Sequence, residues 1–177
     1  TVTPAASPVP ALKYRLYPSH LDRKDGNAVP IYLRFAHERN DANKKRLMDK
    51  PAEWNKLPLD RLPLAEAKEF LAGYRYNLKQ IELGARRKVA EWNYTFDAGN
   101  PIGMLLPDVQ EMRIQAPLLV LKARVEVAEG RLADAVRSLE TGFSFSQQVS
   151  EAPFLISSLV GVAVANLITE ATLELAE

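Results

Sequence analysis

The chain of 177 residues contains no cysteine, which excludes disulfide bonds and thiolate metal ligands. This absence does not assign a compartment, because an oxidising one permits disulfides without requiring them. Histidine is scarce too: His20 and His37 are the only two, and neither has a partner at metal-ligand spacing. A phosphate-cradling glycine-rich loop, a His-Glu-x-x-His pattern and a nucleophile elbow are also missing. We therefore assign no catalytic residue, no metal site and no cofactor.

A strong net charge is missing as well, since 23 Lys and Arg against 22 Asp and Glu leave +1. The charges are unevenly placed: residues 1–97 carry 18 − 12 = +6, and residues 98–177 carry 5 − 10 = −5. Such an asymmetry can orient a partner or a second copy of the chain. It falls well short of the basic footprint of a nucleic-acid-binding domain, so we expect no nucleic-acid partner.

What the sequence does contain is helical periodicity, and no segment alternates at period two, so we predict no sheet. An ordered loop is expected over residues 50–63, and Pro117 should kink or split its helix near Gln115. The fold class is predicted to be all-α, an irregular helical array with antiparallel helix stacking in the C-terminal half. Helices are predicted from Pro30, over Leu64–Leu71, Tyr74–Trp92, Pro107–Glu129, Leu132–Val149 and Pro153–Glu177.

The domain organisation follows from this pattern. Residues 1–29 are predicted to be mostly irregular, with a turn at Asp25-Gly26-Asn27, and to pack on a single helical domain over residues 30–177. Thr1–Pro10 holds three prolines and no charge, as does the tail left after a secretory signal is removed. We therefore expect export to a periplasmic or extracellular location, with a cytoplasmic one as the alternative. The last helix reaches Glu177 without a closing residue, so we expect the native chain to continue beyond 177.

Small residues mark a helical hairpin in the C-terminal half. Ala123, Gly130, Ala135 and Gly142 are separated by 7, 5 and 7 residues. The alanines allow two antiparallel helices to approach closely, Gly130 allows a positive φ in the turn, and Gly142 leaves room for a following helix. Over about 118–147 this spacing resembles a single tetratricopeptide repeat.

The resemblance implies repeat-like stacking over about 107–177 and a surface for protein partners. Two positions depart from the repeat: Glu126 stands where a large aromatic is usual, and Gln147 where a proline is usual. Neighbouring repeats at a distance of 34 residues do not fit.

A second resemblance covers the whole chain, which is similar to the N-terminal part of a group of exported, functionally uncharacterised planctomycete proteins. The segments that carry it are Ala11–Pro18, Gly26–Phe35, Leu105–Arg113 and Gly130–Gly142. It implies a bacterial source, a longer parent protein and no catalytic residues to transfer.

Residues 152–169 contain no charged residue and approach the length of a membrane span. Polar residues such as Asn166 dilute this segment, and Ser157, Gly161 and Ala165 lie four apart, a spacing that lets helices touch closely. We predict a buried helix that covers the hairpin. An oligomer or downstream-domain interface is the first alternative, and a membrane span is the least favoured.

These observations lead to three hypotheses for function. The first is a protein-interaction or scaffolding module of a larger exported protein, whose partner is another protein or a downstream domain of the same chain. Arg113, Glu126 and Asn166 are its candidate interaction face. The second is an enzyme domain whose site is completed by a further C-terminal part. The third is a structural self-assembly module that forms a homo-oligomer.

Overall fold

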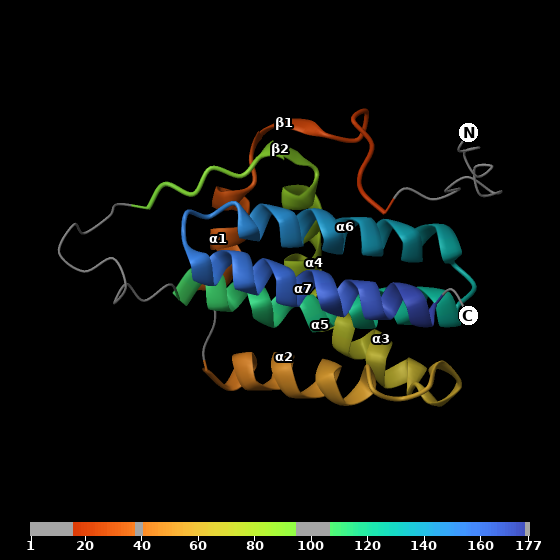
Figure 1. Cartoon of the computed structure of the whole chain (residues 1–177). Coiled ribbons are helices and arrows are strands. Elements are labelled where there is room, and N and C mark those ends of the chain that lie inside the picture. Colours follow the sequence, from red (N-terminus) through yellow and green to blue (C-terminus); the bar gives the residue numbers. More distant parts are fainter. Residues whose placement is uncertain (1–15, 38–40, 95–106, 176–177) are drawn as a thin grey trace, which may run out of the picture.

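The computed structural model describes residues 16–37, 41–94 and 107–175, and most of these residues are helical (Figure 1). The fold class is all-α, as predicted. Three long helices form the C-terminal half: α5 (Pro107–Ala128), α6 (Leu132–Ser150) and α7 (Leu155–Glu174). The shorter elements, in chain order, are β1 (Lys24–Asn27), α1 (Val29–His37), α2 (Asp41–Trp54), the 3-10 turn η1 (Leu59–Arg61), α3 (Leu64–Gly73), α4 (Arg75–Ala85) and β2 (Arg87–Val89).

Helix α5 lies at the centre of the array. It contacts α6 and α7 on one side and α1, α2, α3 and η1 on the others. Because it has neighbours all round, its apolar residues cover every face rather than a single stripe. Its fully buried hydrophobic residues include Val109, Met112, Ala116, Leu118, Leu121 and Ala123.

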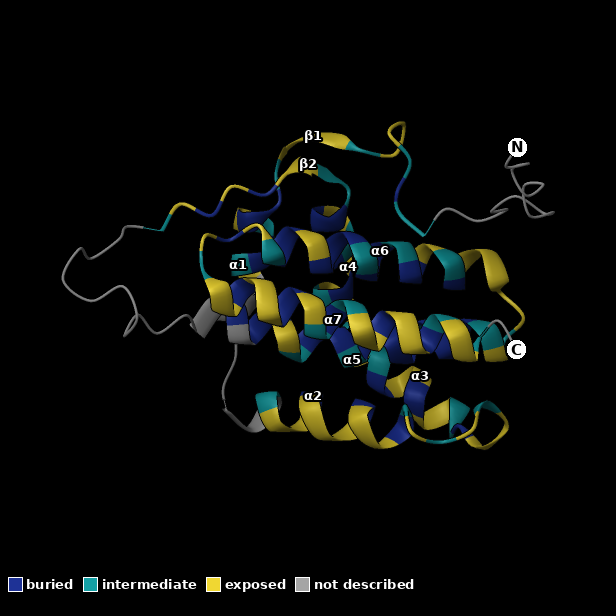
Figure 2. Cartoon of the chain, in the orientation of Figure 1, coloured by how far each residue is buried: buried dark blue, intermediate teal, exposed yellow. Residues whose placement is uncertain are grey.

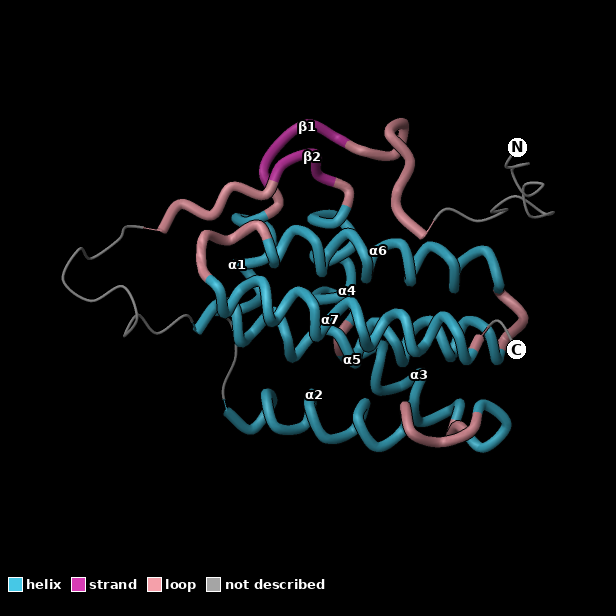
Figure 3. The backbone as a smooth tube through the Cα atoms, in the orientation of Figure 1, coloured by secondary structure: helices cyan, strands magenta, loops and turns pink. Residues whose placement is uncertain are grey.

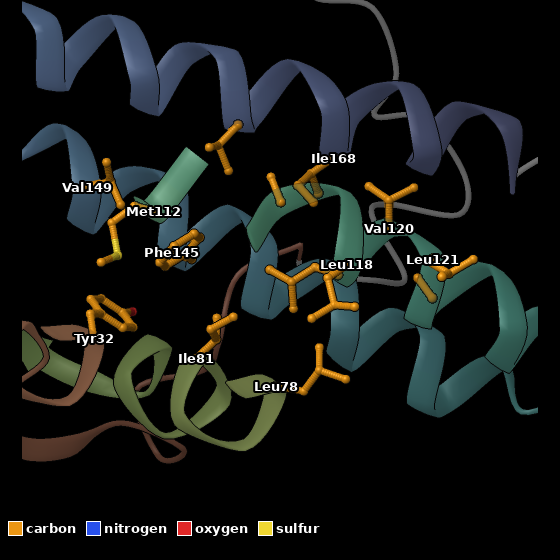
Figure 4. Close-up of a cluster of buried hydrophobic side chains, with 14 of the residues drawn as sticks. Tyr32, Leu78, Ile81, Met112, Leu118, Val120, Leu121, Phe145, Val149 and Ile168 are labelled. Atoms are coloured by element: carbon orange, nitrogen blue, oxygen red, sulfur yellow. The ribbon is translucent and has the colours of Figure 1, made fainter. Parts of the chain in front are cut away.

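The core joins α5, α6 and α7 to the N-terminal helices (Figure 4). Tyr32 of α1 meets Phe145 of α6 edge to face, with the ring centroids 5.0 Å apart. The phenolic oxygen of Tyr32 donates a hydrogen bond to Gln148, which is buried on the same helix. Tyr32 also passes so close to Gly84 of α4 that a side chain there would collide with its ring. An aromatic pair and a close helix approach therefore fix α1 against α4 and α6.

The small residues of the α5–α6 hairpin have the predicted roles. Gly130 adopts a φ of +74°, a backbone conformation that glycine reaches without steric cost. Ala123 and Ala135 are buried. A Cβ atom added at Gly142 would lie 2.5 Å from Cδ1 of Ile168, so this glycine lets α7 lie directly on α6.

The structure corrects the prediction of an ordered loop from residue 50. Helix α2 continues to Trp54, with Pro51 inside it. Leu47, Pro51 and Trp54 are buried on the face toward α5, at the four- and three-residue spacing of a helix. The other described residues of α2, including the apolar Met48 and Ala52, are not buried, so only these three positions signalled the helix.

Helix α4 is shorter than predicted, because the chain leaves the helix after Ala85 and forms β2. Strands β1 and β2 pair in parallel along the edge next to α6 (Figure 3). The predictions of no sheet and of a turn at residues 25–27 were therefore wrong. Backbone and side-chain bonds fix the pairing: Lys24 N donates to Arg86 O at 2.7 Å, and Lys88 Nζ lies 2.7 Å from Asp25 Oδ1.

Helix α5 runs from Pro107 to Ala128 through Pro117, so of the predicted kink or split near Gln115 the split does not occur. The Pro117 carbonyl accepts a hydrogen bond of 2.9 Å from the Asn55 side chain, which lies just after α2. Thr1–Pro10, on which the export prediction rests, and residues 176–177 lie outside the described residues.

Candidate functional site

Two surfaces stand out, and the first is a charged groove where α3 and α4 meet α5 and α6. Glu126 lies on its floor and is only 4% exposed. Its carboxylate accepts hydrogen bonds of 2.5 Å from Lys122 Nζ and 2.6 Å from Ser138 Oγ. Arg131 Nη1 approaches the same carboxylate at 3.6 Å. The buried charge of Glu126 is therefore balanced by its own neighbours.

Ion pairs also cover the rim of this groove. Glu129 is held by Lys68, with Nζ 2.5 Å from Oε1, and by the guanidinium of Arg131. These hydrogen bonds, the one from Lys68 first, lower the pKa of Glu129 below its ordinary value. Arg131 also reaches Asp134 at 2.9 Å. The groove thus contains two adjoining cavities, of about 110 and 310 Å³, whose charges largely satisfy one another.

The second surface is the outer face of α7. One side of this helix, which includes Ser157, Gly161 and Ile168, packs on α6 and α5. The opposite side is exposed although it is apolar: Leu155 is 78% exposed, and Leu159 and Val162 are each 57% exposed. The exposed segments recur along the whole length of α7 in Figure 2. We call the stripe formed by Leu155, Leu159, Val162, Asn166, Thr169 and Leu173 the α7 stripe.

Among the described helices, α7 is the one long and apolar enough to cross a membrane by length and composition. Only 33% of its most apolar window is buried inside the protein. The prediction of a helix buried on several sides therefore fails for α7. Helix α5 is the more buried of the two, with Arg113 as an exposed exception, although its sequence carries more charges.

The three predicted interaction residues do not form one face. Asn166 is exposed in the middle of the α7 stripe. Arg113 is exposed too, and it lines a cavity of about 310 Å³ between α2, α5 and α7. Glu126 is buried in the charged groove, whose cavities share no residue with the one beside Arg113.

Sequence reasoning missed Arg124, a positioning residue that is only 1% exposed. Its guanidinium donates to the carbonyl of Asn55 at 2.6 Å and to the carbonyl of Leu57, and it lies 2.9 Å from a carboxylate oxygen of Glu174. It therefore joins the end of α7 and the loop after α2 to the central helix. A cation within the apolar run of α5 was the signal available in the sequence.

Comparison with known proteins adds no assignment to this geometry. No protein-family model matches the chain, and neither the curated proteins nor the solved structures gave a match.

Titratable groups give little sign of chemistry in the part of the chain that the structure describes. No three His, Asp or Glu side chains gather there as a metal site would require. His20 is exposed in a turn. Burial raises the pKa of Glu140 above its ordinary value, yet this carboxylate lines neither cavity of the charged groove. Of the two surfaces, the α7 stripe is the one on which a row of large apolar side chains stays more than half exposed.

Proposed function

We propose that this chain is a protein-interaction module that binds its partner through the outer face of α7. The observation that carries the proposal is an uncharged helix surface, Leu155 to Thr169, that stays exposed although the other side of the same helix is buried. Large apolar side chains in a contiguous exposed row mark sites of association. The proposal extends to a module of a larger, exported protein, which the resemblance to exported planctomycete proteins supports.

A protein partner suits this surface better than a membrane does. Helices that lie on membranes carry Lys or Arg along the border of their apolar face. Helix α7 has no Lys or Arg, and its charged residues are Glu170 and Glu174. Asn166 also interrupts the apolar row at its centre, where a protein partner can supply hydrogen bonds and lipid tails cannot.

The enzyme alternative would need a deep pocket in which Glu, Arg and Tyr side chains converge. The charged groove brings Glu126 and Arg131 together, but no tyrosine lines its cavities and its charges pair with one another. No observation among the described residues favours that alternative over the interaction module.

Photo-crosslinking tests the proposal directly. A photoreactive phenylalanine analogue replaces Val162 on the α7 stripe or, as the matched control, Tyr76, which is 48% exposed on α4. Both variants are irradiated in the cells that make the protein, and the adducts are identified by mass spectrometry. We expect protein adducts from position 162 and none from position 76. Adducts with lipid alone, or no adduct at position 162, would contradict the proposal.

A further inference from the structure

We propose that the partner of the α7 stripe is a second copy of this chain, bound through a parallel, two-stranded pairing of α7 with α7. This inference rests on the proposed function, because it names the occupant of the same surface. Three features of the stripe support it: the spacing of its residues, the polar residue Asn166 within it, and its exposed apolar area.

The spacing is that of a coiled-coil seam. Successive members of the α7 stripe are separated by 4, 3, 4, 3 and 4 residues. A row with this spacing keeps facing one partner helix when two helices wind gently around each other. In heptad terms, Leu159, Asn166 and Leu173 occupy a positions, and Leu155, Val162 and Thr169 occupy d positions. The seam runs over all 20 residues of α7, a length of about 30 Å.

The layer of the seam that contains Asn166 favours a second copy of the chain as the partner and a parallel orientation of the two helices. In a parallel, in-register pair each layer meets its own copy, so the amide of Asn166 faces an identical amide and gains a hydrogen-bond partner inside the seam. In the antiparallel pair centred on the helix, Asn166 faces Val162, which leaves the amide against an apolar side chain. The Thr169 hydroxyl already donates to the Ala165 carbonyl at 2.9 Å, so it is satisfied in either direction. A single asparagine at an a position also favours a defined register.

Charge does not oppose this pairing. Glu170 is the only charged residue at the positions that flank the seam, and in the parallel pair its neighbour on the other copy is Ala165. No like charges therefore meet across the contact. The two copies are equivalent about a two-fold axis that runs along the paired helices, which closes the assembly at a dimer.

The available apolar area suits a small dimer interface. The exposed large apolar residues on the seam side of α7 are Leu155, Ile156, Leu159, Val162 and Leu173, because Leu167 instead lines the cavities beside α2. Their exposed fractions amount to about three fully exposed side chains, or roughly 300 Å² per copy at about 100 Å² for each side chain. Two copies therefore offer roughly 600 Å², which is the apolar share of an interface of about 1,000 Å² in total. Interfaces of this size are weak, so we expect a dissociation constant of about 10 μM.

Sedimentation equilibrium over a range of protein concentrations tests the proposal. The 19.8 kDa chain should approach twice that mass, about 40 kDa, as its concentration rises through about 10 μM. Leu159→Glu should weaken the pairing at least tenfold, because it places a carboxylate in an a layer. Leu132→Glu is the matched control: Leu132 is 61% exposed on α6 and lies outside the stripe. Both leucines are exposed, so far-UV circular dichroism should show that both variants fold.

An introduced cysteine near the centre of the seam tests whether the two helices pair in parallel. The chain has no cysteine, so Val162→Cys introduces the only thiol and keeps Asn166 in place. In the parallel pair the two introduced thiols face each other and should form a disulfide-linked dimer on mild oxidation, whereas Leu132→Cys should not. A chain that stays monomeric far above 10 μM, a dimer indifferent to Leu159→Glu, or a dimer without the linkage at residue 162 would each overturn the proposal.

The outcomes separate this proposal from the proposed function. A monomeric chain whose photo-crosslinks at residue 162 lead to a different protein refutes self-pairing and leaves the interaction module standing. A monomeric chain without any protein crosslink at residue 162 refutes both.

Discussion

Helices α5 and α7 have similar lengths, yet their surroundings are the opposite of what their sequences suggest. Helix α5 carries Arg124 and Glu126 in its second half and is buried over most of its surface, with Arg113 exposed. Helix α7 has no charge before Glu170 and is buried on one side only. The comparison teaches that the number of neighbouring helices, and not the apolar content of the helix itself, decides how much of it is buried. A charge can be accommodated at the centre of the array when ion pairs surround it, and an apolar face can stay exposed when no helix covers it.

The largest expected effect is the difference in stability between two arginine variants, one on α5 and one on α7. Ala123→Arg forces a charged side chain into the fully buried surface of α5 and should lower the free energy of unfolding by about 4 kcal/mol or more. Val162→Arg on the α7 stripe should change it by no more than about 0.5 kcal/mol. Urea denaturation of both variants, at a protein concentration well below that of any self-association, measures the difference. Equal losses in the two variants would show that α7 is not exposed as described.

Removing the cation from α5 should give the second largest effect. Arg124→Ala leaves two backbone carbonyls, those of Asn55 and Leu57, without their donor and opens a cavity beside α7. We expect a loss of about 3 kcal/mol in the free energy of unfolding.

Arg124→Met is the matched control, because it keeps the volume of the side chain and removes only the charge and the hydrogen bonds. It should cost about half as much as Arg124→Ala, measured by the same denaturation. If both variants unfold at the wild-type urea concentration, Arg124 does not join α7 to the central helix.

The buried side of α7 can be tested separately from its exposed side. Gly142→Ala adds a methyl group 2.5 Å from Cδ1 of Ile168, so either the Ile168 side chain changes its rotamer or the two helices move apart. We expect a loss of about 1–2 kcal/mol, measured as a lower thermal midpoint. Gly73→Ala is the control: nothing lies within 4 Å of the added atom, so the better helix propensity of alanine should stabilise the protein by about 0.5 kcal/mol. A stabilising Gly142→Ala would contradict the close packing of α6 on α7.

The long helices of the C-terminal half could be predicted because their apolar, glycine-poor segments extend over many turns and because Gly130 marks the bend between α5 and α6. The shorter elements could not. Helix α2 shows only three apolar positions to the core, and its remaining residues are those of a solvated segment. Strand β2 follows α4 directly, and its Val89 continues the helical spacing of Ile81 and Ala85, so the sequence alone extends the helix.

The candidate site was predictable only in part. Asn166 was selected from the sequence, and it lies at the centre of the α7 stripe. Its surroundings were not predictable, because a helix that is apolar all round gives no indication of which side its neighbours cover. Glu126 was selected as well, but as a surface residue. Its burial depends on Ser138 and Lys122, which compensate its charge only after α5 and α6 have come together.

The smallest expected effect concerns a charge at the end of α5. Hydrogen bonds from Lys68 and Arg131 lower the pKa of Glu129 in the folded protein below its ordinary value of 4.5. A carboxylate with a lowered pKa contributes stability that is fully present above the unfolded pKa and is lost as the pH falls through the folded one. The carboxyl chemical shift of Glu129, followed by NMR from pH 7 downward, should therefore have its midpoint below 4.5. Lys68→Met should raise that midpoint, whereas Lys45→Met on the exposed side of α2 should leave it unchanged. A midpoint indifferent to Lys68→Met would mean that the charges around α5 are screened by water, as those on α7 are, and the electrostatic contrast between the two helices would disappear.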